Sequence, residues 1–126
     1  MGNRLSKIVT RTGDDGTTGL GDGSRVGKDS LRIDVIGEID ELNSTLGVLL
    51  AEDLPDTIRA ALTAIQHDLF DLGGEICMPG YTAINESHVV RLETLVAQFN
   101  SELNPLKEFI LPGGTRAASL AHLVRS

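Results

Sequence analysis

The chain has 126 residues, of which 40% are hydrophobic and 3% aromatic, and its formal net charge is −7. This length suits one domain, and the absence of Trp indicates an aliphatic core. The acidic balance argues against a nucleic-acid binder, no apolar run could span a membrane or serve as a secretory signal, and Cys77 alone cannot form an intramolecular disulfide. We therefore expect a protein of the reducing cytoplasm.

The first thirty residues differ from the rest of the chain. Up to Arg32, six basic side chains oppose four acidic ones, and glycines concentrate in the stretch TGDDGTTGLGDGSRVGKD. The segment has no helical periodicity, so it is an ordered loop or a flexible arm, and its composition favours the flexible arm. Its glycines and threonines, with charge from Arg11, Arg25 and Lys28, are also the components of an anion-binding loop. The pattern is neither a P-loop nor a dinucleotide-binding fingerprint, so it does not name a substrate.

Apolar residues then recur every three or four positions, which predicts four amphipathic helices. The first covers about 31–50, and the second follows Pro55 through apolar positions 58–76. The third begins at Asn85, a capping residue, and stops before Asn104-Pro105, while the fourth follows residues 112–114 and has no stop signal. Short linkers favour antiparallel neighbours, so we predict an all-α up-down helical bundle. The expected organisation is one domain, with a loop segment at 1–30 and the bundle at 31–126.

Asp40 interrupts the apolar face of the first predicted helix. A buried carboxylate needs a cationic partner, for which Arg125 is a candidate, whereas an Asp40 at the edge of the face would stay in water. Spacing alone leaves both interpretations open. No Glu-x-x-His pair occurs, so we predict no metal site made by side chains. We interpret the remaining reactive side chains as structural: His67, His88 and His122 as surface or helix-flank residues, and Cys77 as a small buried hydrophobe.

Five motifs, in this order and spacing, resemble the trimeric ATP:cob(I)alamin adenosyltransferases over nearly the whole chain. The motifs are TRTGDDGTT at 10–18, RVGK at 25–28, GEIDELNS at 37–44, DLFDLGG at 68–74 and FILPGG at 109–114. The resemblance implies a five-helix bundle assembled as a homotrimer, with each active site between adjacent subunits. From the resemblance we expect the last helix of that fold to lie beyond the residues of this sequence.

The resemblance also implies roles for single residues. Asp40 would pair across the subunit interface with Arg125, and Phe109 would bind the corrin ring and help to displace the lower axial ligand of cobalt. These three residues are the implied catalytic set. ATP would be bound by residues of the N-terminal loop, namely Thr10, Arg11, Thr12, Gly13, Thr18, Gly19 and Lys28.

The implied reaction is transfer of the 5′-deoxyadenosyl group of ATP to the Co(I) of cob(I)alamin, with release of triphosphate. Lys28 and Mg²⁺ would stabilise the charge on the leaving group, and a reductase partner would supply Co(I). Family members continue beyond the position of Arg125, so we expect a truncated rather than a naturally shortened member. The alternatives are a corrinoid-binding or chaperone-like subunit without catalysis, and a helical interaction protein with a disordered arm.

Overall fold

The glycine-rich segment is folded, not a flexible arm. In the computed structural model, which describes residues 6–126, it forms an antiparallel hairpin of β1 (Thr17–Gly19) and β2 (Arg25–Gly27). The carboxylate of Asp22 accepts the N–H and the hydroxyl of Ser24 at 2.9 and 2.6 Å, and Gly23 adopts a φ of 87° that glycine tolerates without strain. The register pairs Thr17 with Gly27, Thr18 with Val26 and Gly19 with Arg25. The expectation of a flexible arm was wrong because local side-chain hydrogen bonds, which apolar periodicity does not reveal, order this segment.

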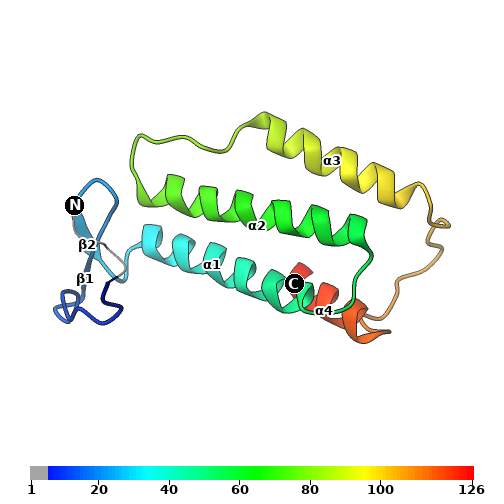
Figure 1. Ribbon diagram of the computed structural model, residues 1–126, viewed down its shortest axis with the longest axis horizontal. Coiled ribbons are helices and arrows are strands. Elements are labelled where there is room, and N and C mark those ends of the chain that lie inside the picture. The colour runs from blue at the N-terminus through cyan, green and yellow to red at the C-terminus, as the bar shows by residue number, and fades with distance from the viewer. Residues whose placement is uncertain (1–5) are drawn as a thin grey trace.

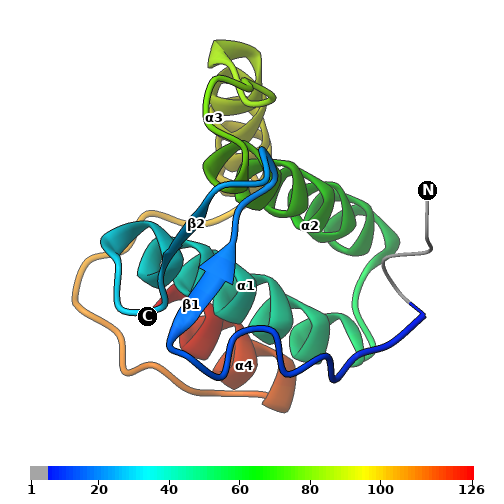
Figure 2. The same cartoon turned by 90° about the vertical axis from the view of Figure 1, so that its left-hand side faces the viewer.

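The hairpin is followed by four helices at nearly the predicted positions (Figure 1). These are α1 (Leu31–Leu50), α2 (Asp56–Cys77), α3 (Glu86–Asn100) and α4 (Arg116–Arg125). The closest helix packing joins α1 to α2, and α4 packs on α1. Figures 1 and 2 show α3 beside α2, on the side away from α1, so the four helices stack in the order α3, α2, α1, α4. The predicted all-α bundle is confirmed for the part of the chain that the structure describes.

The start of α3 confirms the predicted cap. The Asn85 side chain accepts the N–H of Ser87 at 2.9 Å, and Nδ1 of His88 accepts the N–H of Asn85 at 3.2 Å, which completes a capping box. His88 is thus a helix-flank residue. The helix ends at Asn100, earlier than expected, because the N–H of Leu103 turns back to the carbonyl of Asn100.

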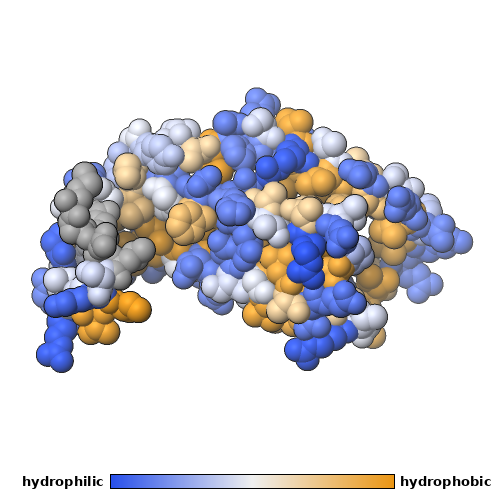
Figure 3. Space-filling view, viewed as in Figure 1, coloured by the Kyte–Doolittle hydropathy of each residue, from blue (hydrophilic) through white to orange (hydrophobic). Residues whose placement is uncertain are grey.

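The buried core of the chain is small. Among residues 6–126, the buried apolar side chains are Leu20, Leu46 and Leu49, at 7%, 3% and 5% exposure. Apolar side chains reach the surface on all four helices, and Figure 3 shows them between the polar ones on one face. Exposed apolar surface on this scale is typical of faces that bind another molecule. None of the helices in this range is both long and apolar enough to cross a bilayer.

Candidate functional site

The residues predicted to bind ATP lie in the hairpin and its N-terminal loop, except Lys28, which directly follows β2. The hydroxyls of Thr10 and Thr12 are hydrogen-bonded at 2.9 Å. Gly13 lies directly under Lys28, because a Cβ added to Gly13 would be 2.9 Å from Nζ of Lys28 and 2.8 Å from the backbone oxygen of Thr17. Only glycine fits there. The ammonium group of Lys28 therefore lies over the loop backbone, where an anion could bind to it.

The backbone of this loop is compact and locally strained. The N–H of Gly16 donates to the carbonyl of Gly13 at 3.1 Å, and the N–H of Lys28 donates to the carbonyl of Gly16 at 2.9 Å. Arg11 has a φ of 59°, in the left-handed region that non-glycine residues rarely adopt. Such strain often accompanies functional sites, and sequence reasoning gave no signal for it.

Two carboxylates in the hairpin have internal partners. Asp15 accepts the N–H and the hydroxyl of Thr17 at 2.9 and 2.8 Å, and these bonds, with the nearby charge of Arg25, hold the pKa of Asp15 below its ordinary value. The hydroxyl and the N–H of Ser24 lower the pKa of Asp22 in the same way. Within residues 6–126, no three His, Cys, Asp or Glu side chains gather where they could hold a metal ion.

The hairpin is attached to the C-terminal end of α2. The side chain of Leu20 is buried, and the N–H of Gly21 donates to the carbonyl of Cys77 at 2.8 Å. Nη1 of Arg32 donates to the carbonyl of Ile76 at 2.5 Å. These carbonyls belong to the last turn of a helix and lack partners within it, so Gly21 of the hairpin and Arg32 of α1 satisfy them.

Asp40 is exposed in the single chain and borders a groove of about 410 Å³ between α1 and α2. The groove is mainly apolar and includes Phe70, which is 78% exposed. Deeper between the helices, the side-chain amides of Asn43 and Gln66 each donate to the other's backbone carbonyl at 3.1 Å. Within one chain, the interpretation of Asp40 as a water-exposed edge residue is therefore correct.

Arg125 lies on the other side of α1 from Asp40. It borders a different hollow, together with Glu38 and Glu41, near the end of α4. The ion pairs among the described residues do not include Asp40 with Arg125. One chain alone does not bring the two predicted partners together.

Phe109 lies in the segment 101–115 between α3 and α4 and is fully exposed. The hairpin and this segment lie at opposite ends of the bundle (Figure 1). The predicted nucleotide residues and the predicted corrin-binding residue are therefore far apart in a single chain.

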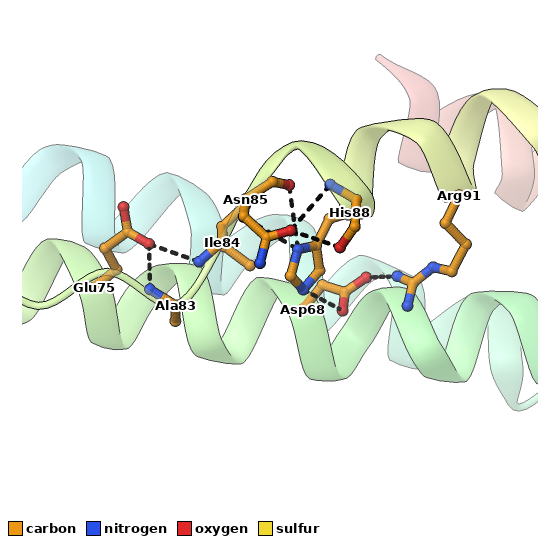
Figure 4. Close-up of polar contacts among 8 residues, drawn as sticks. Asp68, Glu75, Ala83, Ile84, Asn85, His88 and Arg91 are labelled. Carbon is orange, nitrogen blue, oxygen red and sulfur yellow. Dashed lines mark hydrogen bonds and ion pairs between the residues drawn. The ribbon is translucent and has the colours of Figure 1, made fainter.

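Two acidic residues of α2 hold the start of α3 (Figure 4). Asp68 forms an ion pair with Arg91 and lies 3.8 Å from Nε2 of His88. Two helical turns later, Glu75 receives two backbone hydrogen bonds from the residues that precede α3. These contacts attach the first half of α3, the helix that leads into the segment carrying Phe109, to α2.

The donors to Glu75 are the N–H groups of Ile84 and Ala83, each at 2.9 Å, and they lower the pKa of the Glu75 carboxyl group. The other end of segment 101–115 is fixed by Nε of Arg116, which donates to Glu52 at 2.7 Å. Sequence reasoning missed these anchors, because the partners lie on different elements and no local pattern joins them.

The chain is similar to known proteins in both sequence and fold. The sequence pattern of the cobalamin adenosyltransferase family matches residues 8–126. The chain is 64% identical over its whole length to a cobalamin adenosyltransferase of Cupriavidus metallidurans, of which it covers 69%. It is 41% identical over its whole length to a corrinoid adenosyltransferase of Mycobacterium leprae, of which it covers 72%.

Solved structures show the same fold. A variant PduO-type ATP:corrinoid adenosyltransferase from Lactobacillus reuteri, complexed with cobalamin and ATP, is 31% identical and superposes with a TM-score of 0.87 over 94% of this chain and 70% of its own. Another variant of that type, complexed with ATP, superposes with a TM-score of 0.86 at 33% identity, again over 94% of this chain and 70% of its own.

Proposed function

The chain belongs to the cobalamin adenosyltransferase family, and we propose that it transfers the 5′-deoxyadenosyl group of ATP to the Co(I) of cob(I)alamin and releases triphosphate. It is thus an enzyme of the transferase class. In this reaction the cobalt electron pair forms the bond to the 5′ carbon, and the bond from that carbon to the triphosphate oxygen breaks. The protein supplies position and electrostatic stabilisation, while the corrinoid supplies the nucleophile.

The hairpin is the proposed ATP site. The loop 10–13, Thr18, Gly19 and Lys28 bind the nucleotide, with the Lys28 ammonium over Gly13 next to the triphosphate. Negative charge accumulates on the leaving triphosphate, and an ammonium group next to it stabilises that charge as it develops. The position of Lys28 is the observation that carries this part of the proposal.

Mg²⁺ enters this proposal as part of the substrate MgATP. Magnesium bound to nucleotides usually takes most of its ligands from phosphate oxygens and water, with one or two carboxylates. Asp15 and Asp22 have hydrogen-bond partners inside the hairpin, whereas Asp14 is exposed beside Gly13. Asp14 is therefore the carboxylate of the loop that suits this ion.

Phe109 is the proposed contact to the corrin ring. Its exposed ring would exclude water and the lower axial ligand from cobalt, which makes reduction to Co(I) easier. A separate reductase delivers the electron. The free Cys77 suits the reducing cytoplasm that we propose as the location.

A homotrimer with active sites between subunits accounts for the separation of the two regions. The hairpin and Phe109 lie at opposite ends of one chain, so a site containing both needs two copies. Asp40 and Arg125 are both exposed and unpaired with each other in one chain, so each is available to a neighbouring copy.

The planar guanidinium group of an arginine can donate two parallel hydrogen bonds to one carboxylate. We therefore expect Asp40→Ala and Arg125→Ala to shift sedimentation from trimer towards monomer. The exchange Asp40→Arg with Arg125→Asp should restore part of the trimer. Three unperturbed trimers would contradict the pair.

The direct test is to mix the protein with ATP and chemically reduced cob(I)alamin. We expect the absorbance spectrum of adenosylcobalamin to appear and triphosphate to be released in equal amount. Lys28→Ala should weaken ATP binding by roughly ten- to a hundredfold and leave corrinoid binding unchanged, with Lys7→Ala as the matched control. Corrinoid binding without formation of adenosylcobalamin would instead support the non-catalytic carrier. The similarity to adenosyltransferases argues against that alternative.

A further inference from the structure

Arg25 of β2 donates its hydrogen bonds into the hairpin rather than towards solvent. Nε donates to Oγ1 of Thr17 at 3.1 Å. Nη2 donates to the carbonyl of Thr12 at 2.8 Å and to Oγ1 and the carbonyl of Thr17 at 2.8 and 3.2 Å. One guanidinium group thus joins β2, β1 and the loop before β1.

The hydrogen bond from Arg25 to the carbonyl of Thr12 connects the loop to the hairpin. Among the described residues, it is the only hydrogen bond that joins residues 10–12 to either strand of the hairpin. The other bonds of these residues are the Thr10–Thr12 hydroxyl contact and the N–H of Asp14 to the carbonyl of Arg11, and both stay within the loop. Without Arg25, residues 10–12 would therefore have no polar attachment to the folded strands.

The charge of Arg25 is also balanced inside the hairpin. Thr17 receives the guanidinium on its hydroxyl oxygen and donates the same hydroxyl to Asp15 at 2.8 Å. The order of contacts is therefore Thr12, Arg25, Thr17, Asp15. A guanidinium that turned towards a phosphate would leave the carbonyls of Thr12 and Thr17 without these donors. Lys28 differs, because its ammonium has no ion pair or hydrogen-bond partner in the described part of the chain.

We propose that Arg25 is a positioning residue, which holds loop 10–12 in its binding shape before ATP arrives and does not itself bind the phosphates. The link to ATP rests on the proposed function, whereas the effect on the loop does not. The two cations of the RVGK motif then have different tasks: Arg25 shapes the loop with its planar fork, and Lys28 supplies the charge that an anion meets.

The test compares Arg25→Lys, Arg25→Ala and Lys28→Ala with the wild-type chain. Hydrogen exchange of residues 10–18 is measured without nucleotide, and ATP affinity is measured by calorimetry at several salt concentrations. Because lysine keeps the charge but loses the fork, we expect both Arg25 variants to exchange at least about tenfold faster and to bind ATP roughly ten- to a hundredfold more weakly, with the salt dependence of the wild type. Lys28→Ala should keep the exchange rates, weaken ATP binding and reduce its salt dependence.

Two outcomes overturn the proposal. One is wild-type exchange in both Arg25 variants. The other is near-normal ATP affinity in Arg25→Lys with a reduced salt dependence in Arg25→Ala, which would make Arg25 a phosphate ligand. A wild-type chain that does not bind ATP overturns the proposed function instead, while the exchange rates still decide whether Arg25 shapes the loop.

Thr17 provides a second, independent comparison. Thr17→Ser keeps the hydroxyl and should behave as wild type, whereas Thr17→Val removes it and should speed exchange of residues 10–18. Arg25 acts partly through this hydroxyl. In the double variant, Thr17→Val should therefore increase the exchange rate of residues 10–18 little beyond the increase caused by Arg25→Ala alone. Fully multiplicative effects of the two substitutions would contradict the proposed coupling. Circular dichroism of the helices confirms in each case that only the hairpin has changed.

Discussion

The hairpin at one end of the bundle and segment 101–115 at the other are held in opposite ways. The hairpin consists of small and polar residues, yet its carboxylates, hydroxyls and Arg25 satisfy one another, and the N–H of Gly21 attaches it to the carbonyl of Cys77 in α2. Segment 101–115 is rich in apolar side chains, and those from Leu103 to Leu111 are exposed, Leu111 at 91%. Its polar anchors lie at its ends, on α3 and α4.

The difference shows that the polarity of a segment does not predict whether its own side chains can supply the interactions that order it. Hydrogen bonds between neighbouring side chains can be completed within one short stretch of chain. Apolar side chains gain stability only when another surface covers them, and for segment 101–115 that surface is not provided by the described part of this chain. The hairpin should therefore respond to changes within the chain, and the apolar segment should respond to what binds it.

The largest contrast should come from truncating one apolar side chain in each region. Leu20→Ala should lower the free energy of unfolding by about 2–3 kcal/mol, because the side chain of Leu20 is buried. Phe109→Ala should change it by less than about 0.5 kcal/mol, because its ring is fully exposed, but it should reduce adenosylcobalamin formation and the fraction of four-coordinate Co(II). Thermal melting and the cobalt spectrum measure the two effects. If Phe109→Ala destabilised the chain by several kcal/mol, Phe109 would be a core residue.

The next largest contrast should come from replacing one glycine by alanine in each region and comparing the ATP affinities. Gly13→Ala places a Cβ 2.8 Å from the Thr17 carbonyl, so the loop must move, at a cost of about 1–3 kcal/mol and up to roughly a hundredfold in ATP affinity. Gly113→Ala is the control, since a Cβ there has no atom within 4 Å. Calorimetric titration with ATP measures both variants. Equal affinities would show that the loop is not closely packed around Gly13.

The attachment of α3 should be weaker than the packing of the hairpin. Asp68→Ala removes the partner of Arg91, and since this pair is partly exposed we expect a loss of about 1 kcal/mol. Hydrogen exchange should become faster in α3 and in segment 101–115 and stay unchanged in the hairpin. Asp71→Ala, an exposed carboxylate one turn later, is the matched control. Faster exchange in the hairpin would mean that α3 and the hairpin are coupled.

The smallest effect should be a pH dependence of the hairpin. The pKa values of Asp15 and Asp22 are lowered in the folded chain relative to their ordinary value of 3.8, so their hydrogen bonds stabilise the hairpin fully above that pH and are lost as the pH falls through the lowered values. The amide resonances of Thr17 and Ser24 should therefore keep their folded positions down to pH 3.8 and move below it. Asp15→Asn and Asp22→Asn should each remove part of this acid transition. A hairpin whose resonances move above that pH would contradict the assignment.

The sequence determined the helices well, because their signals are local. The apolar spacing located α1 and α2 almost to the residue, and Asn85 was predicted as the cap of α3 from its side chain alone. The ordered motifs were sufficient to indicate the family, which the comparisons confirmed. Composition misled only in the glycine-rich segment, where it favoured a flexible arm over the hairpin.

Tertiary structure decided which residues meet. That Leu20 is buried, that Asp68 binds Arg91, and that Arg25 holds the carbonyl of Thr12 depend on elements folding against each other, and no periodicity encodes such pairs. The chain also places Asp40 and Arg125 on different sides of α1, although spacing had allowed them to pair. The physical reason is that backbone preferences and apolar periodicity act within a few residues, whereas a side-chain contact depends on the relative position of whole helices, which only their packing determines.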